Sequence, residues 1–276
     1  MNTFKLGELL NQFFIEDIGD GDLTSTSIFS KDEQAEGLFT AKADGTFSGL
    51  DVLLQGYDLA DSTIKVESLV QDGDQISKGQ NLLRVHGPVV ELLSRERVIL
   101  NLVQRMSGIA TQTHQAVSLL NSDHTKICDT RKTVPGLRML DKYAVLCGGG
   151  ANHRFGLYDG VMIKDNHIEH MGGILPAVKK VREKCGHMVK IEVETETREQ
   201  VLEAIEAAVD VIMFDNRTPD EIREFAKLVP PHIVTEASGG ITLNTLPSYS
   251  NTGVDLISLG FLTHSVKALD ISFNLL

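Results

Sequence analysis

Short apolar segments recur at a nearly constant spacing through the second half of the chain, and most of them end in a polar residue. They occupy residues 126–129, 161–164, 189–194, 211–215, 233–236 and 256–258. The ends of the last four segments lie 21, 21 and 22 residues apart, which is the length of one strand, one loop and one helix. Uninterrupted apolar runs are typical of strands buried on both faces of a sheet. The spacing therefore predicts parallel strands that alternate with helices.

This alternation fits two architectures, a closed (β/α) barrel and an open, doubly wound sheet. Polar residues follow the strands all along the series instead of gathering at one switch point, and this distribution favours the barrel. With 276 residues, the chain is long enough for a barrel and a smaller companion domain. The carboxyl ends of barrel strands face the active-site mouth, so the residues there are the candidates for chemistry.

The first hundred residues have a different pattern, which predicts a small α+β domain. Apolar runs at 39–42, 64–67 and 82–85 indicate strands, and the segments 72–74 and 77–79 indicate turns between them.

A helical apolar stripe from residue 89 to residue 120 predicts one long helix that joins the two parts and is broken at Ser107 and Gly108. The segment 72–79 also resembles the hairpin of lipoyl and biotinyl carrier domains. No lysine stands at a matching hairpin tip, however, so the carrier interpretation is not favoured.

Positive charge is concentrated in one stretch of an otherwise acidic chain. The formal net charge is −12, yet residues 97–164 contain nine Lys or Arg residues against four Asp residues, a net charge of +5. Guanidinium groups pair bidentately with carboxylates and phosphates, so this stretch predicts a site for a small polyanion. The acidic remainder argues against a nucleic-acid partner, which requires an exposed basic face.

The sequence carries no signal for export or membrane insertion. No apolar run is long enough to span a bilayer, and residues 1–5 lack the apolar core of a signal peptide. Cys128, Cys147 and Cys185 are odd in number and widely spaced, which fits neither a disulfide framework nor a zinc site. We therefore expect free thiols in a cytoplasmic protein.

Four cations follow predicted strands or the glycine-rich loop at residues 148–154: Arg131, Lys132, Arg154 and Lys164. Four positive charges in one place repel one another unless an anion binds, so a shared ligand explains them better than a solvated surface does. The glycine-rich loop is not a dinucleotide-binding fingerprint, because no strand leads into it and its spacing is different.

Glu194 and Asp215 end neighbouring predicted strands. Two carboxylates there can hold Mg²⁺, accept hydrogen bonds from sugar hydroxyls or exchange protons, whereas as helix N-caps or ion-pair partners they would only stabilise the fold. The segment 238–240 follows the next strand and precedes a helix expected near Thr242. Glycine lets backbone amides approach an anion, and barrels commonly bind phosphate at this place. His167 and His170 lack a further ligand at a set spacing, which argues against a metal site.

A set of sequence motifs extends from residue 16 to residue 270, nearly the whole chain. The motifs are residues 16–24, 96–97, 100–101, 104–111, 129–138, 142–145, 148–154, 156–159, 163–168, 237–241, 262–265 and 268–270. Together they resemble the quinolinate phosphoribosyltransferase family, the decarboxylating nicotinate-nucleotide pyrophosphorylases of NAD synthesis. Ala151 and Phe214 differ from the residues expected in many members, but neither supplies a functional group.

The resemblance implies the α/β fold of a type II phosphoribosyltransferase, with a seven-stranded α/β barrel and an N-terminal open α/β sandwich domain. We place the sandwich domain at residues 1–105, joined by the C-terminal segment 264–276, and the barrel at residues 106–263. The resemblance also implies a homodimer whose active sites lie at the subunit interface, and in some members a larger homo-oligomer.

The implied reaction transfers the phosphoribosyl group of phosphoribosyl pyrophosphate to quinolinate, giving nicotinate mononucleotide, CO₂ and pyrophosphate. It uses Mg²⁺ and no organic cofactor, because the ring nitrogen of the substrate becomes cationic and serves as the electron sink. The resemblance implies quinolinate ligands at Arg131, His153, Arg154 and Lys164, with Arg105 contributed by the neighbouring subunit. On the phosphoribosyl side it implies Lys132, Glu194, Asp215, Ser238, Gly239, Gly240 and Gly260.

Four of these residues are the catalytic candidates: Lys132, Lys164, Glu194 and Asp215. Glu194 and Asp215 are also the candidate Mg²⁺ ligands, either directly or through water. Three other functions fit parts of the pattern. A Schiff-base aldolase would use Lys164 as its nucleophile, and an anion-binding regulatory module would use the four cations but leave the paired carboxylates unexplained. A paralogue of the family associated with molybdenum transport should lack the motifs at 156–159 and 163–168.

Overall fold

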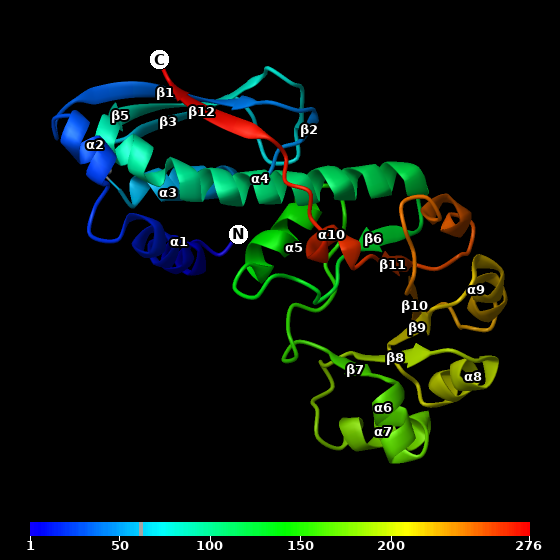
Figure 1. Cartoon of the computed structure of the whole chain (residues 1–276). Helices are drawn as coiled ribbons and strands as arrows, with labels where there is room; N and C mark the ends of the chain where they lie inside the picture. Colours follow the sequence, from blue (N-terminus) through cyan, green and yellow to red (C-terminus); the bar gives the residue numbers. More distant parts are fainter. Residues whose placement is uncertain (61–62) are drawn as a thin grey trace. The chain divides into compact units, whose positions relative to one another are not determined.

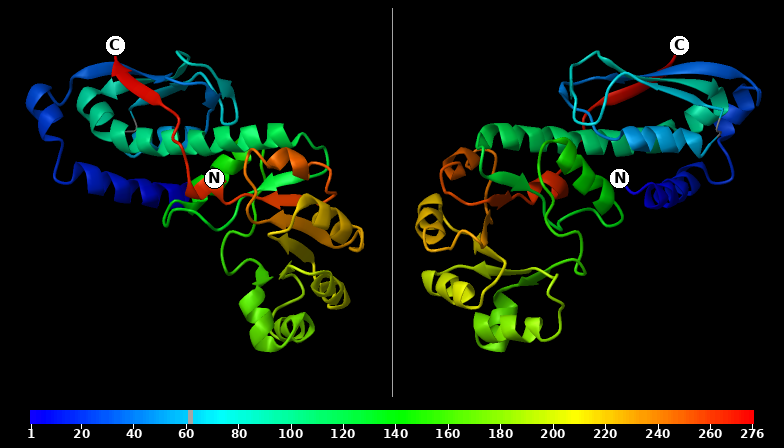
Figure 2. Two further views of the ribbon diagram at one scale, coloured as in Figure 1. Left: turned by 45° about the vertical axis from the view of Figure 1, so that its right-hand side comes forward. Right: turned by 180° about the vertical axis from the view of Figure 1, so that it is seen from behind.

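Two compact units make up the computed structural model, which describes residues 1–60 and 63–276 (Figure 1, Figure 2). The first unit comprises residues 1–114, 134–149 and 265–276, and the second comprises residues 115–133 and 150–264. The division at residues 105 and 263 made from the sequence stays a prediction. Within the described ranges, no helix is both long and apolar enough to cross a membrane.

The first unit is built on an antiparallel sheet with the strand order β12-β1-β5-β3, and the α+β character expected from the sequence is confirmed. The strands of this unit are β1 (Gln34–Ala41), β2 (Gly45–Thr46), β3 (Lys65–Ser68), β4 (Gln75–Ile76), β5 (Asn81–Pro88) and β12 (Ile271–Leu275). Its helices are α1 (Thr3–Ile18), α2 (Leu23–Ile28), α3 (Leu50–Asp58) and α5 (Arg138–Cys147), together with most of α4 (Val89–Leu120).

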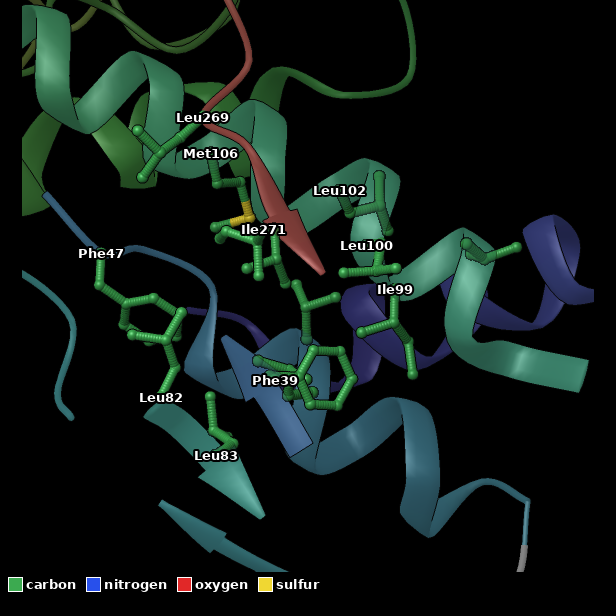
Figure 3. Packing of buried hydrophobic residues seen from close by; sticks show 14 of the residues in the cluster. Phe39, Phe47, Leu82, Leu83, Ile99, Leu100, Leu102, Met106, Leu269 and Ile271 are labelled. Atoms are coloured by element: carbon green, nitrogen blue, oxygen red, sulfur yellow. The ribbon is translucent and has the colours of Figure 1, made fainter. Parts of the chain in front are cut away.

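The C-terminal strand β12 pairs with the first strand of the chain, β1, so that segments far apart in the sequence share one sheet. Phe273 of β12 packs against Phe39 of β1 with ring centroids 4.8 Å apart. Figure 3 shows sheet residues such as Phe39 and residues of α4 such as Ile99 and Met106 in one apolar cluster, and all three are buried. Burial of each such side chain contributes roughly 1.5–3 kcal/mol, so this cluster is the main source of the unit's stability.

Helix α4 is continuous over all 32 residues, and the predicted break at Ser107 and Gly108 is wrong. The two small residues instead allow close packing. The Ser107 hydroxyl accepts a hydrogen bond from the Ser48 amide at 3.0 Å and donates one to the Ser48 carbonyl at 3.1 Å. At Gly108 a Cβ would lie 2.3 Å from the carbonyl oxygen of Lys267. The residues that suggested a break therefore mark the line along which two backbones meet.

The second unit contains a parallel sheet with the strand order β6-β11-β10-β9-β8-β7, as the alternating pattern predicts. Its strands are β6 (Lys126–Cys128), β7 (Val161–Ile163), β8 (Ile191–Thr195), β9 (Val211–Asp215), β10 (Val234–Ser238) and β11 (Leu256–Ser258). Its helices are α6 (Asp165–Met171), α7 (Ile174–Arg182), α8 (Arg198–Glu206), α9 (Pro219–Ala226), α10 (Phe261–His264) and the 3-10 helix η1 (Leu246–Tyr249).

The α/β fold class is confirmed, with one difference in how the strands are formed. The parallel sheet has six strands in the described chain, where the sequence led us to expect seven. Ala151 lies between β6 and β7 in the chain and forms a single parallel bridge with Cys128 of β6. This bridge occupies the place of the seventh strand, and its brevity follows from the glycine-rich segment before it, because glycine weakens strand formation.

Capping boxes begin two helices directly after the strands that precede them. The hydroxyl of Thr197 accepts a hydrogen bond from the Gln200 amide, and the Gln200 side chain accepts one from the Thr197 amide. Thr218 and Glu221 make the same exchange at the start of α9. Each capping box starts its helix soon after the strand ends, so the loop between them is short. The polar residues at the ends of β8 and β9 therefore stay close to the edge of the sheet.

We predict that Gly108→Ala destabilises the protein by about 1–3 kcal/mol, although alanine is normally the better helix former, because its methyl group overlaps the backbone at Lys267. The midpoint of urea denaturation measures the effect. Gly7→Ala in α1 is the matched control, since the added Cβ would meet only the flexible side chain of Gln55. An equal or smaller loss for Gly108→Ala than for Gly7→Ala would contradict the prediction.

Candidate active site

A cavity of about 580 Å³ lies at the carboxyl ends of the parallel strands, where the sequence places the chemistry. All of its lining residues belong to the second unit. They are Thr130, Arg131, Lys132, His153, Arg154, Met162, Lys164, Glu194, Met213, Asp215, Asn216, Glu236, Ser238, Gly239, Gly240 and Ser258. Ten of the residues predicted from the sequence therefore meet in one cavity: Arg131, Lys132, His153, Arg154, Lys164, Glu194, Asp215, Ser238, Gly239 and Gly240.

Two guanidinium groups give the cavity its affinity for anions. The Arg131 Nε is buried and has no hydrogen-bond partner in the described chain. Burial, followed by the like charge of Arg131, lowers the pKa of Arg154 from its ordinary value. One N–H group of the Arg154 guanidinium donates a hydrogen bond to the carbonyl oxygen of Gly160 at 2.8 Å. A cationic donor left unpaired beside a second cation is costly, and a ligand with several negatively charged oxygens would relieve both effects.

The buried carboxylate of Asp129 holds the loop that carries Arg154. Its Oδ1 accepts a hydrogen bond from the His153 amide at 2.9 Å, and its Oδ2 accepts one from the Asn152 side chain at 2.6 Å. Asp159 closes the following turn by accepting bonds from two further amides, at 2.6 and 2.9 Å. These charge-assisted bonds fix the backbone on both sides of Arg154, so the guanidinium is directed from a rigid base.

Lys164 and Glu194 form an ion pair across the cavity wall. Burial raises the pKa of Glu194 in spite of this pairing, and the neighbouring carboxylate of Asp215 raises it further. The two carboxylates stand at the ends of adjacent strands, β8 and β9, as the sequence predicts. Two acidic groups this close favour a cation or hydrogen-bond donors between them.

The turn after β10 presents backbone amides to the cavity. Gly239 and Gly240 have φ values of +87° and +67°, and a Cβ at Gly239 would lie 2.2 Å from the Asn216 side chain. Only glycine fits this path, which forms the kind of concave amide surface that binds phosphate. The helix expected near Thr242 is absent there. Thr242 and Thr245 hydrogen-bond to each other's amides instead, and η1 begins only at Leu246.

A cluster of ionisable groups that the sequence analysis missed lies at the base of the cavity. The His153 Nε2 is 2.9 Å from the Glu192 Oε2 and 3.6 Å from the Glu236 Oε2. Its Nδ1 accepts a hydrogen bond from the Arg154 amide at 2.7 Å. Burial and the charge of Glu192 raise the pKa of Glu236 to about 7. The signal in the sequence was a glutamate inside an apolar run, at positions 192 and 236, where a buried strand should carry none.

Two of the predicted residues are not among those lining the cavity. Gly260 lies behind Lys132, since a Cβ at Gly260 would be 3.0 Å from the Lys132 side chain. Arg105 belongs to the first unit, where it forms a bidentate ion pair of 2.8 Å contacts with the buried Asp141. The role of Arg105 in a neighbouring subunit's site stays a prediction.

Comparison with known proteins identifies related sequences over the full chain. The family model of the quinolinate phosphoribosyl transferase N-terminal domain matches residues 22–107, and that of the C-terminal domain matches residues 109–274. The chain is 59% identical over 274 residues to the probable nicotinate-nucleotide pyrophosphorylase [carboxylating] of Bacillus subtilis, covering 99% of this chain and 94% of that protein. It is 41% identical to the mitochondrial quinolinate phosphoribosyltransferase [decarboxylating] 2 of Nicotiana glauca, covering 99% and 83%.

Solved structures with similar sequences also superpose on this chain. NadC from Streptococcus pyogenes superposes with a TM-score of 0.96 at 37% identity, covering 100% of this chain and 99% of that one. The nicotinate-nucleotide pyrophosphorylase from Francisella tularensis superposes with a TM-score of 0.94 at 34% identity, covering 100% and 98%.

We predict that Asp129→Asn lowers the free energy of unfolding by about 1–3 kcal/mol, because the new amide turns a donor toward the donors of His153 or Asn152. Urea denaturation measures the loss. The control is Asp123→Asn, which removes an exposed carboxylate from the loop before β6 and should change stability by no more than about 0.5 kcal/mol. Equal stability of the two variants would show that Asp129 does not hold the loop.

Proposed function

The chain belongs to the quinolinate phosphoribosyltransferase family, and we propose that its cavity binds quinolinate on the arginine side and phosphoribosyl pyrophosphate on the carboxylate side. The enzyme transfers the phosphoribosyl group to the ring nitrogen of quinolinate with loss of CO₂, giving nicotinate mononucleotide and pyrophosphate. The observation that carries the assignment of sides is the buried, unpaired Nε of Arg131 next to the desolvated guanidinium of Arg154.

Quinolinate is a flat dianion with two carboxylates on adjacent ring carbons. Arg131 and Arg154 offer planar donor groups that bind carboxylates in pairs, and a dianion between them cancels the repulsion that lowers the pKa of Arg154. Lys164 lies on the same cavity wall and can exchange its partner Glu194 for a carboxylate of the substrate. These contacts orient the ring nitrogen toward the second substrate, which is where binding energy lowers the barrier.

The phosphoribosyl side is assigned to the opposite part of the cavity. The amides at Gly239 and Gly240 suit the 5′-phosphate, because their positive φ values turn the backbone into a concave anion site. Lys132 lines the cavity and supplies a positive charge for the pyrophosphate. Glu194 and Asp215 suit the ribose, where carboxylates accept hydrogen bonds from hydroxyls and favour the positive charge that develops on the sugar as pyrophosphate leaves.

Glu194 and Asp215 are also the residues that fit Mg²⁺. They supply hard carboxylate oxygens at adjacent strand ends, and the pKa of Glu194 is raised by burial and by Asp215, so a divalent cation would favour the ionised form. When bound, Mg²⁺ stabilises the charge of the departing pyrophosphate. Lys164 pairs with Glu194 in the protein alone and keeps that carboxylate ionised in the absence of the cation.

A Schiff-base aldolase would need Lys164 as a free nucleophile, but its ammonium group is ion-paired with Glu194. We propose a cytoplasmic enzyme, and the absence of a disulfide among the described residues is compatible with a reducing compartment. We also propose a homodimer in which Arg105 of one subunit serves the site of the other. Its ion pair with Asp141 gives that arginine a fixed direction within its own unit.

The function predicts that the purified protein forms nicotinate mononucleotide from quinolinate and phosphoribosyl pyrophosphate in a Mg²⁺-dependent reaction, with nicotinate a poor substrate. Nicotinate lacks the second carboxylate and leaves part of the arginine cluster unpaired in a desolvated site, which costs about 1–3 kcal/mol, or roughly 10- to 100-fold in kcat/KM. Steady-state kinetics with each acid provides the measurement. Equal turnover of quinolinate and nicotinate would refute the assignment of the arginine side.

The shared site predicts complementation between two defective variants, Arg105→Lys and Arg154→Ala. The lysine keeps a positive charge beside the buried Asp141, so the variant should fold while losing the planar donor group. Mixed dimers carry both defects in one site and none in the other. Random mixing in equal amounts should therefore restore about a quarter of wild-type activity. Absence of recovery, once mass spectrometry has detected the mixed dimers, would place Arg105 outside the partner's site.

A further inference from the structure

Three ionisable side chains of the second unit lie together beneath the substrate cavity. The ligand atoms of His153, Glu192 and Glu236 all lie within 4.8 Å of one another, and the Nε2 of His153 lies between the two carboxylates. Glu192 and Glu236 are buried to 5% and 1% exposure, yet both His153 and Glu236 line the cavity. The cluster is therefore shielded from bulk water but open to a bound substrate.

The cluster has more hydrogen-bond acceptors than donors when both glutamates are ionised. The Oε1 atoms of Glu192 and Glu236 are buried and have no hydrogen-bond partner in the described chain. The Nδ1 of His153 accepts from the Arg154 amide, so the neutral ring offers one N–H, from Nε2, to the two carboxylates, and the Ser258 hydroxyl is the other donor that acts on Glu236. A proton retained on one carboxyl group corrects the imbalance, because like charges this close disfavour double ionisation.

Glu236 is the carboxyl group that retains the proton. Its pKa is raised to about 7 by burial and by Glu192, and Glu194 raises it further, while His153 and Ser258 act in the opposite direction. Those groups face it from β8, from the loop after β6 and from β11, and Met213 of β9 stands opposite it in the sheet. The raised pKa favours the neutral form of Glu236 in comparison with an ordinary glutamate.

The proposed reaction needs a proton at one defined carbon. Loss of CO₂ leaves an electron pair on C2 of the ring, next to the cationic nitrogen, and the product carries hydrogen there. Guanidinium groups such as those of Arg131 and Arg154 do not give up protons in proteins, and Lys164 is occupied by its ion pair with Glu194. Glu236 lines the cavity, and its raised pKa suits proton donation near pH 7.

We propose that Glu236 protonates the ring carbon that loses CO₂ and that His153, held by Glu192, orients the Glu236 carboxyl group. This inference rests on the proposed function. In the step, the bond between C2 and the carboxyl carbon breaks, its electron pair stays on C2, and the Glu236 O–H bond transfers its proton to form the new C2–H bond. The Glu236 carboxylate then takes up one proton from the solvent that enters when the product leaves, so that each turnover consumes one solvent proton, while the Nε2–H of His153 stays in place as a hydrogen-bond donor.

The contacts around His153 suit proton donation by Glu236. The Arg154 amide fixes Nδ1 as an acceptor, so the exchangeable proton of the ring resides on Nε2, facing both glutamates. Asp129 holds the backbone of His153, which keeps the ring in place while the substrate binds to Arg154 in the same loop. The carboxyl group of Glu192 anchors the imidazole through a contact of 2.9 Å with Nε2. Thus the group that binds substrate and the group that supplies the proton are fixed by one short segment.

The test compares the full-length enzyme with Glu236→Gln, which keeps the size of the side chain but cannot donate a proton to carbon. Both are mixed with quinolinate, phosphoribosyl pyrophosphate and Mg²⁺ and quenched chemically. We expect pyrophosphate release within about threefold of wild type, and conversion of the undecarboxylated mononucleotide to product slowed about 100-fold. That intermediate should accumulate and be detected by mass spectrometry. Glu196→Gln, which alters an exposed carboxylate just after β8, is the control and should behave as wild type.

Two further readouts separate a proton donor from a structural role. In equal volumes of H₂O and D₂O, the ratio of hydrogen to deuterium at C2 of the product should differ between wild type and Glu236→Gln, because water replaces the carboxyl group as donor. The wild-type rate of the decarboxylation step should fall above pH about 7, since Glu236 must be protonated, and this fall should be absent in Glu236→Gln. In Glu192→Gln the fall should move to lower pH, because the neighbouring charge that raises the pKa is removed.

Several outcomes would overturn the proposal. An unchanged isotope ratio at C2 would show that Glu236 is not the donor, and so would unimpeded decarboxylation in Glu236→Gln. Loss of pyrophosphate release in that variant would place the cluster in the transfer step instead. One equivalent of a transition metal retained by the wild type and lost from Glu236→Gln would make the cluster a metal site. Failure of the wild type to form nicotinate mononucleotide would refute the proposed function itself, which is a separate result.

Discussion

The repulsion between two half-buried guanidinium groups is the constraint on which the site depends. Burial and the charge of Arg131 lower the pKa of Arg154, and the fold leaves one buried donor of Arg131 unpaired. A protein can keep two such cations close together without a ligand only when the backbone around them is rigid. Asp129 and Asp159 provide that rigidity by binding amides on both sides of Arg154. Binding of a dianion would relieve this repulsion, whose free-energy cost is already present in the folded protein. The relief favours a doubly charged substrate over a singly charged one.

The strand ends and helix caps of the parallel sheet position the remaining groups of the site. Charged residues and glycines lie at or next to the strand ends, and capping boxes at Thr197 and Thr218 start the next helix within a few residues. The short loops leave the side chains of Glu194 and Asp215 little freedom to move away from each other. In the first unit the long helix α4 supports the antiparallel sheet, and close backbone contact at Gly108 fixes the C-terminal segment that leads into β12. The stability of each unit thus comes from apolar packing, and the polar residues are free to serve the site.

The sequence predicted the parts of the structure that depend on local order. Apolar runs at a constant spacing predicted the strands of the second unit, and the residues following them predicted most of the cavity wall, including Arg131, Lys164 and Asp215. The break at Ser107 and Gly108 was wrong, because small residues that weaken an isolated helix also permit close packing, and only the distant partner decides between these effects. Glu192 and Glu236 were missed for a similar reason. A spacing pattern shows that a residue lies in a strand. The burial of its side chain and the charged neighbours that shift its pKa depend on strands that only the fold brings together.

The charges that line the cavity bear on the substrate charge that it is proposed to bind. Arg131, Lys132, Arg154 and Lys164 line it together with Glu194, Asp215 and Glu236. If all three carboxyl groups were ionised, the four cations would exceed them by one charge. Because burial and Glu192 raise the pKa of Glu236, the neutral form of this residue enlarges the positive excess among these lining groups. Binding of a dianion in turn raises the pKa of a nearby carboxyl group, so the proposed substrate would stabilise the protonated form of Glu236. In the proposed function, substrate charge and proton retention therefore reinforce each other, because the dianion that the arginines bind also favours the proton that replaces its departing carboxylate.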